Sequence, residues 1–367
     1  MAVSVDQQFL NYAIRLGLRG LGRTWPNPSV GCVLVKDGII IATARTADGG
    51  RPHAETIALA SAGDAARGAT AYVSLEPCAH YGKTPPCAQA LIDAGIARVV
   101  FGAIDPDSRV SSQGFTMLEA AGVTVEKLLL PAAAGSHRGF FSRIQKNRPH
   151  VTMKLATSLD GQIADANGQS QWITAPRARA HGHLLRYQSD AILTGIGTVL
   201  ADDPMLNVRL PGLAHPRLVR IVADRNLRLP LNSQIVCTAE QEPVWIITTP
   251  EGIEQQASHA TELRERGVNM IALEAISPAS ILTALAEAGI TRLLVEAGPT
   301  LSTAFIADHR VDTLYWYRAP ITLGGAGNPA IAALDCALKT APRHRFTDAM
   351  TLGDDRCDIV EFACSPD

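Results

Sequence analysis

The chain has 367 residues, of which 47% are hydrophobic and 19% charged, and its formal net charge is −2 at pH 7. This length exceeds one ordinary hydrophobic core, so we expect two globular domains. The nearly balanced charge, with no run of Lys or Arg, argues against a general nucleic-acid or membrane-surface binder.

The N-terminal segment lacks a basic stretch followed by a long apolar run, so we expect no signal peptide. No stretch of about 18 uninterrupted apolar residues predicts a membrane-spanning helix. The seven cysteines are odd in number and widely scattered, which does not fit a disulfide framework. We therefore expect a reduced, cytoplasmic protein.

The first predicted elements are a helix and a hairpin. Ser4 is a candidate cap for a helix that extends to about residue 20. Apolar runs at 30–35 and 39–44 predict the two strands of the hairpin. Between helix and hairpin, Pro26-Asn27-Pro28 fixes an extended loop that presents one amide. Such a loop suits the reading of a base edge, and an ordinary turn is the open alternative.

Four side chains from two local segments form a candidate metal site. His53 and Glu55 are predicted in the first turn of a helix, where their side chains splay apart. Cys78 follows a predicted strand, at a point where a second helix could begin, and Cys87 precedes a helix at 88–94. One imidazole and two thiolates leave one open position on a tetrahedral zinc ion, which is the catalytic arrangement. Glu55 would then handle protons beside the metal without binding it.

The alternative is a structural zinc site with four protein ligands, in which His80 would be the fourth. The positions of Glu55 and of the Pro77-Cys78 turn favour catalysis instead. Eight residues separate Cys78 from Cys87, a longer spacing than that of the common Pro-Cys-x-x-Cys signature.

The first half ends with two strands, at 98–103 and 123–128, and a helix near 115–121. The order of elements, α-β-β-α-β-α-β-α-β, predicts an α/β sandwich layered around one sheet. The polar segment 146–149 carries a helix-stopping proline and marks the expected domain boundary. The expected domains are 1–146 and 147–367.

Pro26-Asn27-Pro28, His53-Ala54-Glu55 and the run from Glu76 to Cys87 together resemble the deaminase half of the bifunctional riboflavin-biosynthesis enzyme, a pyrimidine deaminase fused to a reductase. The resemblance implies a cytidine-deaminase-like α/β/α sandwich. It implies that His53, Cys78 and Cys87 hold a zinc ion that activates water, with Glu55 as general acid and base. It also implies substrate contacts from Asn27, His80 and Lys83, and for Lys83 a solvated surface position stays open.

The second half alternates short apolar runs with helical stretches, which predicts a doubly wound sheet. The predicted strands lie at 151–156, 191–194, 218–223, 244–248 and 292–295. Thr174 is expected to cap a helix that runs to about Arg186. The turn Gly195-Ile196-Gly197 lacks the third glycine of a dinucleotide fingerprint. The turn at 296–301 opens a helix and either presents N–H groups to a phosphate or is a generic strand–helix turn.

The segments 154–161, 170–174, 198–204 and 296–300 resemble the reductase half of the same enzyme, whose fold is like that of dihydrofolate reductase. The resemblance implies NADPH contacts from Ala156, Trp172, Thr198, Asp202, Gly298, Pro299, Thr300, Leu301, Ser302, Thr303 and Ala304. It implies substrate contacts from Lys154, Ser170, Arg186, Leu206, Arg209 and Glu296. Arg186 and Arg209 suit a bidentate phosphate clamp, and two surface arginines are the alternative.

These observations predict a cytoplasmic enzyme of riboflavin synthesis with two activities. The first domain would deaminate 2,5-diamino-6-(5-phosphoribosylamino)pyrimidin-4-one with zinc. The second would reduce 5-amino-6-(5-phosphoribosylamino)uracil to its ribitylamino product with NADPH. We expect these small-molecule substrates, no nucleic acid or membrane as partner, and a homo-oligomer. The alternatives are a nucleic-acid base deaminase with an accessory domain, a reductase with a structural zinc module, and a deaminase with a non-catalytic second domain.

Overall fold

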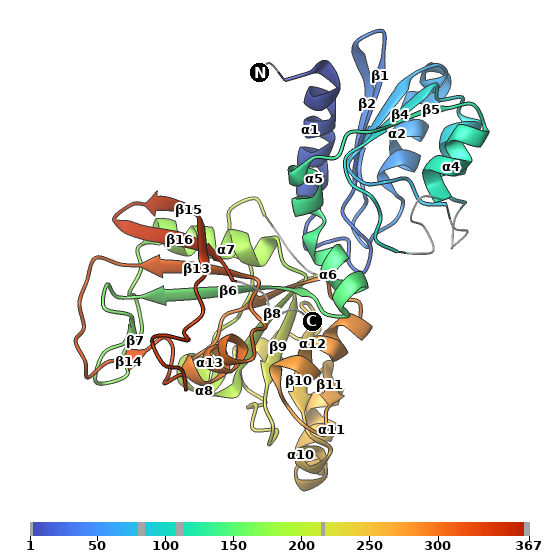
Figure 1. Ribbon diagram of the computed structural model, residues 1–367. Coiled ribbons are helices and arrows are strands. Elements are labelled where there is room, and N and C mark those ends of the chain that lie inside the picture. The colour runs from blue at the N-terminus through green and yellow to red at the C-terminus, as the bar shows by residue number, and fades with distance from the viewer. Residues whose placement is uncertain (1–2, 80–84, 108–112, 214–216, 363–367) are drawn as a thin grey trace. The chain divides into compact units, whose positions relative to one another are not determined.

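The computed structural model describes residues 3–79, 85–107, 113–213 and 217–362. The chain divides into two compact units, Met1–Arg148 and Pro149–Asp367, here the N-terminal unit and the C-terminal unit (Figure 1). Each unit has its own β-sheet and its own hydrophobic core. Among the described residues, no helix combines the length and the apolar character needed to cross a bilayer.

The N-terminal unit is built around a five-stranded sheet with the strand order β2-β1-β3-β4-β5. β1 pairs antiparallel with β2 and β3, whereas β3, β4 and β5 run parallel to one another. β1 is covered on both faces, and its residues Cys32, Val33 and Leu34 are completely buried, which explains its continuous apolar run. The strands are β1 (Gly31–Lys36), β2 (Ile39–Arg45), β3 (Thr70–Val73), β4 (Arg98–Phe101) and β5 (Thr124–Lys127).

Helices cover both faces of this sheet, which confirms the predicted α/β sandwich. α1 and α5 lie on one face, and α2, α3 and α4 lie together on the other (Figure 1). The predicted cap is confirmed, because the Ser4 hydroxyl accepts the N–H of Gln7 at 3.2 Å. The helices are α1 (Val5–Leu18), α2 (Ala54–Ala62), the 3₁₀ turn η1 (Gly63–Ala66), α3 (Cys87–Asp93), α4 (Gln113–Ala120), α5 (Pro131–Ser136) and α6 (Arg138–Lys146).

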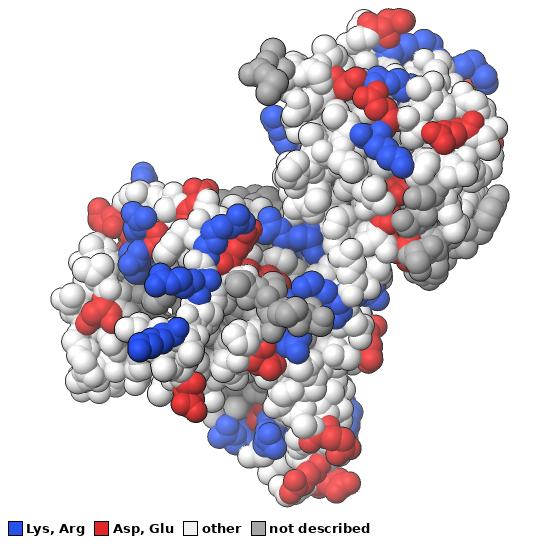
Figure 2. All heavy atoms as spheres, in the orientation of Figure 1, with Lys and Arg blue, Asp and Glu red and all other residues white. Residues whose placement is uncertain are grey.

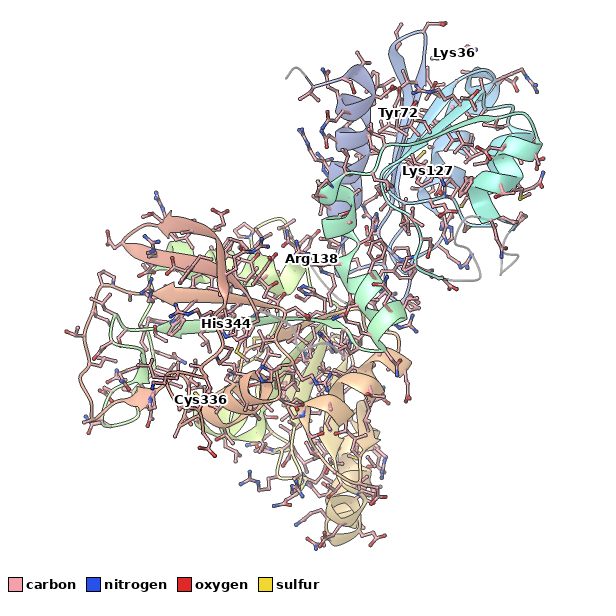
Figure 3. The ribbon with its side chains drawn as sticks, viewed as in Figure 1. Lys36, Tyr72, Lys127, Arg138, Cys336 and His344 are labelled. Carbon is pink, nitrogen blue, oxygen red and sulfur yellow. The ribbon has the colours of Figure 1, made fainter. Side chains whose placement is uncertain are left out.

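Polar side chains tie α1 to the sheet. Tyr72 of β3, labelled in Figure 3, donates its hydroxyl to Asp6 of α1 at 2.5 Å. Arg98 of β4 donates to both carboxylate oxygens of Asp6, at 2.9 and 2.8 Å. The hydrogen bond from Arg98 is the main reason that the pKa of Asp6 falls to about 2. The carboxylate is therefore ionised at neutral pH and anchors the first helix.

Two local expectations around the metal motif are wrong. No helix begins at Cys78, because the described residues 76–79 form a loop after β3. Packing holds this loop: a Cβ added to Gly114 of α4 would lie 1.9 Å from the Pro77 carbonyl oxygen, so the two backbones touch. His53 is the N-cap of α2 rather than a residue of its first turn, and only Glu55 lies in that turn. Cys87 is the first residue of α3.

The C-terminal unit contains a nine-stranded sheet with the order β11-β10-β9-β8-β12-β6-β13-β16-β15. All neighbours from β11 to β13 are parallel, and β16 pairs antiparallel with β13 and β15. The strands are β6 (His150–Thr157), β8 (Ala191–Gly195), β9 (Val219–Ala223), β10 (Val244–Thr248), β11 (Val268–Ala272), β12 (Arg292–Val295), β13 (Thr313–Arg318), β15 (Arg345–Leu352) and β16 (Asp355–Glu361). A separate ribbon pairs β7 (Gln162–Ala164) with β14 (Asn328–Pro329).

Parallel strands alternate with helices along most of this unit, as predicted for a doubly wound domain. The predicted Thr174 cap is wrong: the N-cap of α7 is Ala175, which has no side-chain acceptor, and Asp355 accepts the Ala175 N–H at 2.6 Å. The helices are α7 (Pro176–Tyr187), α8 (Ile196–Asp202), α9 (Gln234–Cys237), α10 (Pro250–Gln255), α11 (Ala257–Glu265), α12 (Pro278–Glu287) and α13 (Pro299–Ala307).

The centre of the large sheet sets the place for a ligand. β8 and β12 are neighbours, and α8 and α13 begin just after their carboxyl ends (Figure 1). The two helix starts are close together, because a Cβ added to Gly298 would lie 3.8 Å from the Thr198 hydroxyl. Open parallel sheets bind ligands beyond the carboxyl ends of their strands.

Candidate active sites

The two thiols and the imidazole of the metal motif meet in the N-terminal unit. The Nδ1 atom of His53 lies 3.2 Å from the sulfur of Cys87 and 3.7 Å from that of Cys78. All three ligand atoms lie within 4.8 Å of one another. Zinc bonds to nitrogen and sulfur in a tetrahedron would separate such atoms by about 3.5 Å. The identity of the donors and the two nitrogen–sulfur distances therefore fit a zinc ion.

One of the two thiols is already shifted toward the thiolate form that binds metals. A hydrogen bond from the thiol of Cys87, reinforced by His53 and opposed by burial, lowers the pKa of Cys78 to about 4. The same contact with Cys78, together with burial, raises the pKa of Cys87. The backbone N–H of Cys87 at the start of α3 also donates to the Cys78 sulfur at 3.3 Å. One sulfur is thus a thiolate at neutral pH, the form that binds metals.

Glu55 lies beside this cluster on the first turn of α2 and is only 3% exposed. Burial raises the pKa of its carboxyl, while the charge of His53 lowers it. Its carboxyl also hydrogen-bonds with the Cys87 thiol. A carboxyl whose pKa is raised is a stronger base and can both accept and return a proton. The structure therefore brings all four residues of the motif into one place.

Three buried carboxyls lie after β3 and β4, one of them close enough to interact electrostatically with Cys78, and none was predicted as a site residue. Glu76 follows β3, and Asp105 and Asp107 follow β4, the parallel neighbour of β3. Burial, with smaller contributions from the charges of Asp107, Glu76 and Cys78, raises the pKa of Asp105 to about 6. The carboxyl ends of parallel neighbours meet at one sheet edge, and this register is the signal that the sequence analysis could have used.

The predicted substrate contacts of the deaminase site can be placed only in part. Asn27 lies after the first helix, and its side-chain amide donates to the Gly50 carbonyl at 3.0 Å. A Cβ on Gly50 would lie 2.5 Å from that amide nitrogen, so glycine is required for this approach. His80 and Lys83 lie outside the described residues.

A cavity of about 800 Å³ opens in the C-terminal unit. It brings together predicted site residues that are spread over more than a hundred positions of the sequence. The predicted residues that line it are Lys154, Ala156, Ser170, Trp172, Arg186, Thr198, Asp202, Leu206, Arg209 and Glu296. The described residues that line it do not include the predicted turn from Gly298 to Ala304, although Gly298 borders Thr198.

Glu296 and Arg186 form a buried ion pair in this cavity. Nε and Nη2 of Arg186 donate to the two carboxylate oxygens of Glu296 at 2.8 and 2.9 Å, and Nη1 donates to the Asn207 carbonyl at 3.0 Å. The ammonium of Lys154 lies 3.7 Å from Glu296. Burial alone would raise the pKa of Glu296, but the charges of Arg186 and Lys154 lower it to about 2. A phosphate contact by Arg186 would have to use its remaining N–H groups.

His183 belongs to the same wall and was missed in the sequence. Its Nδ1 accepts the backbone N–H of Arg209 at 3.3 Å. Burial and the charges of Arg186 and Arg209 lower the pKa of His183 to about 4, so the ring is neutral at pH 7. The Nδ1 atom also lies 3.2 Å from the Asn207 carbonyl oxygen, so its two neighbours favour different ring tautomers. Arg179, His183 and Arg186 share one face of α7 by their i, i+4, i+7 spacing, which is the signal that marks His183.

The other wall carries predicted contacts for both ligands. The Ser170 hydroxyl donates to Asp202 at 3.3 Å, which joins a predicted substrate contact to a predicted NADPH contact. Trp172 is 65% exposed, and the guanidinium carbon of Arg179 lies 4.5 Å from its ring centroid. The cavity therefore combines an aromatic face with several cationic side chains, a donor set that fits a phosphorylated dinucleotide and a phosphorylated substrate.

Two family models match the chain. The cytidine and deoxycytidylate deaminase zinc-binding region matches residues 3–103, and the RibD C-terminal domain matches residues 149–357. Together with the metal cluster of the first unit and the cavity of the second, they define a bifunctional enzyme, a zinc-dependent deaminase joined to a reductase.

Curated relatives match nearly the whole chain. Riboflavin biosynthesis protein RibD of Escherichia coli is 40% identical over 361 residues, covering 96% of this chain and 98% of its own. RibD of Aquifex aeolicus is 37% identical over 360 residues, covering 97% and 98%. The chain belongs to the RibD family of riboflavin biosynthesis proteins. Its cofactors are accordingly zinc and NADPH.

Solved structures agree over the full length. Acinetobacter baumannii RibD, form 1, has a TM-score of 0.89 and 37% identity, covering 99% of this chain and 100% of that one. The deaminase/reductase of Thermotoga maritima has a TM-score of 0.85 and 33% identity, covering 98% and 99%. The predicted combination of a cytidine-deaminase-like unit and a dihydrofolate-reductase-like unit is confirmed.

Proposed function

We propose that residues 1–146 carry the deaminase activity and residues 147–367 the reductase activity. The similar Thermotoga maritima protein is a diaminohydroxyphosphoribosylaminopyrimidine deaminase and 5-amino-6-(5-phosphoribosylamino)uracil reductase. We assign the same two substrates to this chain. Matches to separate family models on either side of the proposed boundary support the division. The second site would then consume the product of the first.

In the deaminase unit, His53, Cys78 and Cys87 would hold the metal, as their mutual distances support. Zinc, when bound, supplies the Lewis acidity that makes water a nucleophile near neutral pH. The Glu55 carboxyl would accept one proton of the attacking water and deliver it to the ring nitrogen, and would then pass the second water proton to the departing amine. Asn27 would orient the pyrimidine, and His80 and Lys83 would contact the ribose-phosphate end.

In the reductase unit, NADPH supplies the two electrons of the reduction. Ala156, Trp172, Thr198, Asp202 and the turn from Gly298 to Ala304 would hold it. The substrate would contact the opposite wall, where Glu296 is fixed by Arg186 and Lys154. This fixed carboxylate would orient the open-chain sugar, and Arg209 would contribute to phosphate binding. The residues that we assign to the substrate are Lys154, Ser170, Arg186, Leu206, Arg209 and Glu296.

We also propose a cytoplasmic homo-oligomer that binds no nucleic acid. β15 is the edge strand of the large sheet, and its Phe346 is 72% exposed, which suits pairing with a second copy. Figure 2 shows acidic side chains among most of the basic ones on the visible face, and a group of acidic side chains at the lower end of the C-terminal unit, unlike a nucleic-acid-binding face.

The convergence of Glu55 with one imidazole and two thiols carries the deaminase assignment, and Glu55→Gln tests it. The variant should keep its zinc, because Glu55 is not a ligand, and should lose ammonia release by about 10²- to 10⁴-fold. Its NADPH-dependent reduction of deaminated substrate should equal that of the wild type, which is the internal control. Unchanged ammonia release in this variant would refute the catalytic role of Glu55, whereas absence of ammonia release from wild type would favour a structural zinc module.

A further inference from the structure

The segment Asp203–Leu206 joins two predicted ligand contacts of the reductase cavity. It follows α8, whose last residue is Asp202, a predicted NADPH contact, and it ends at Leu206, a predicted substrate contact. All four of its residues line the cavity. Its backbone is unusual, because Asp203 has φ +39° and Leu206 has φ +53°. A bulky residue in the left-handed region persists only where the surroundings hold it.

Gln234 holds one end of this segment. Its backbone N–H donates to the Asp203 carboxylate at 2.9 Å, and its side-chain amide donates to the Asp203 carbonyl at 2.6 Å. Asp203 is the C-cap of α8, and these two hydrogen bonds bind both its side chain and its backbone. The left-handed turn that leaves α8 is therefore fixed from outside the helix.

Arg220 of β9 holds the other end. Its side chain is completely buried, and Nη1 donates to the Met205 carbonyl at 3.2 Å. Its terminal nitrogens also bind Thr238 and Glu242: Nη1 donates to the Thr238 hydroxyl at 2.8 Å, and Nη2 donates to the carbonyls of Thr238 and Glu242 at 3.1 and 2.5 Å. A Glu242 carboxylate oxygen lies 3.3 Å away. Arg220 is not among the described residues that line the cavity.

Both anchors converge on one short helix. Gln234 is the first residue of α9, and Thr238 is its C-cap. The Thr238 hydroxyl accepts from Arg220 and donates to the Gln234 carbonyl at 2.8 Å. The helix α9 thus connects the residue that hydrogen-bonds to Asp203 with the residue that positions the donor to Met205. The segment Asp203–Leu206, which forms the cavity wall between the two ligands, is therefore fixed near both ends.

We propose that Arg220 and Gln234 are positioning residues for the reductase reaction: through α9 they fix Asp203–Leu206 so that Asp202 meets the cofactor and Leu206 meets the substrate. The proposal rests on the reductase function proposed above. It assigns no contact with the reacting atoms to either residue. Loss of the hydrogen bonds from either residue should let the segment Asp203–Leu206 move and should weaken the binding of both ligands.

The test compares Gln234→Ala and Arg220→Lys with wild type. Gln234 is exposed, so its replacement leaves the core intact, and Arg220→Lys keeps the buried charge but cannot reproduce the fork. Loss of one or two hydrogen bonds should raise the KM for NADPH and for the deaminated substrate by about 3- to 10-fold, with kcat changed less. Gln255→Ala is the matched control, since Gln255 is also exposed and donates only to Glu251 within α10.

Three readouts separate the outcomes. Ammonia release in the N-terminal unit should be the same in all variants, and Gln255→Ala should match wild type throughout. A calorimetric Kd for NADPH measures cofactor binding without turnover, so it tests the positioning role independently of catalysis. Failure of wild type to oxidise NADPH would refute the reductase function and leave this binding test in place. Wild-type KM and Kd values in Gln234→Ala and Arg220→Lys would overturn the proposal, whatever their melting temperatures.

Discussion

The two sites of this chain are built in opposite ways. The deaminase site takes its ligands from the end of one loop, the loop after β3 and the first residue of α3, all within 35 residues from His53 to Cys87. The reductase cavity draws on residues from Lys154 to Tyr317, which come from several strands, helices and loops. A local site depends on a few close backbone contacts, whereas a distributed site depends on the charge pairs and loops that join its walls.

The largest expected effect is the loss of a metal ligand. Cys78→Ala should remove the thiolate of the cluster and reduce ammonia release by more than about 10³-fold, because the metal activates the water. Zinc content by atomic absorption should fall with activity. Reduction of deaminated substrate in the same protein should persist, since no described residue of the cavity belongs to the N-terminal unit. Loss of both activities together would contradict two independent sites.

Glu296→Gln tests the distributed site. It removes the charge that pairs with Arg186 and Lys154, and leaving a buried cation without its partner costs about 3–5 kcal/mol of unfolding free energy. We expect reduction to fall by about 10²-fold because the wall is misplaced. Denaturant unfolding and steady-state kinetics measure the two effects. Ammonia release should be unaffected, and a variant with wild-type reduction would show that this carboxylate is dispensable.

The pH dependence of stability follows from the same carboxyl. The pKa of Glu296 is lowered from 4.5 to about 2, so its ionised form stabilises the fold above pH 4.5 and that contribution is lost as the pH falls toward 2. The shift corresponds to about 3 kcal/mol. Wild type should therefore lose more unfolding free energy between these pH values than Glu296→Gln does. Parallel pH profiles of the two proteins would contradict the assigned pKa.

Gly114→Ala gives the smallest effect and probes the local site. Its Cβ would lie 1.9 Å from the Pro77 carbonyl oxygen and would push the loop that carries Cys78. We expect about tenfold weaker zinc binding, the size seen when outer contacts of a metal site are lost. Competition with a chelator measures it. Gly135→Ala in α5 is the control, because a Cβ there meets only the flexible end of Arg138 at 3.5 Å. Equal zinc affinity in both variants would show that the loop tolerates the displacement.

The difference between the sites also explains what the sequence could predict. The roles of His53, Glu55, Cys78 and Cys87 could be predicted from the sequence, because their residue types and spacing are those that a catalytic zinc site requires. Most strands of both sheets follow from apolar runs. The prediction of a helix start at Cys78 is wrong because the shape of this loop comes from packing against Gly114, which is distant in the sequence, and local propensity does not contain that contact.

The reductase cavity is harder to predict from the sequence. A resemblance was needed to select Lys154, Arg186 and Glu296, because no local pattern joins three such distant positions. The engagement of Arg186 with Glu296 could not be foreseen, since it depends on α7 facing the end of β12. The hydrogen bond from Arg220 to the Met205 carbonyl could not be predicted for the same reason.

The order of the two reactions provides the most direct test of the central claim, that one chain deaminates and then reduces one scaffold. Wild type and Glu55→Gln are each given the diamino substrate with NADPH, and ammonia and nicotinamide absorbance are followed together. The account predicts that wild type releases ammonia and then oxidises NADPH in equal amounts, and that Glu55→Gln does neither. When deaminated substrate is added, Glu55→Gln should oxidise NADPH and still release no ammonia. Oxidation of NADPH by Glu55→Gln with the diamino substrate alone would contradict it.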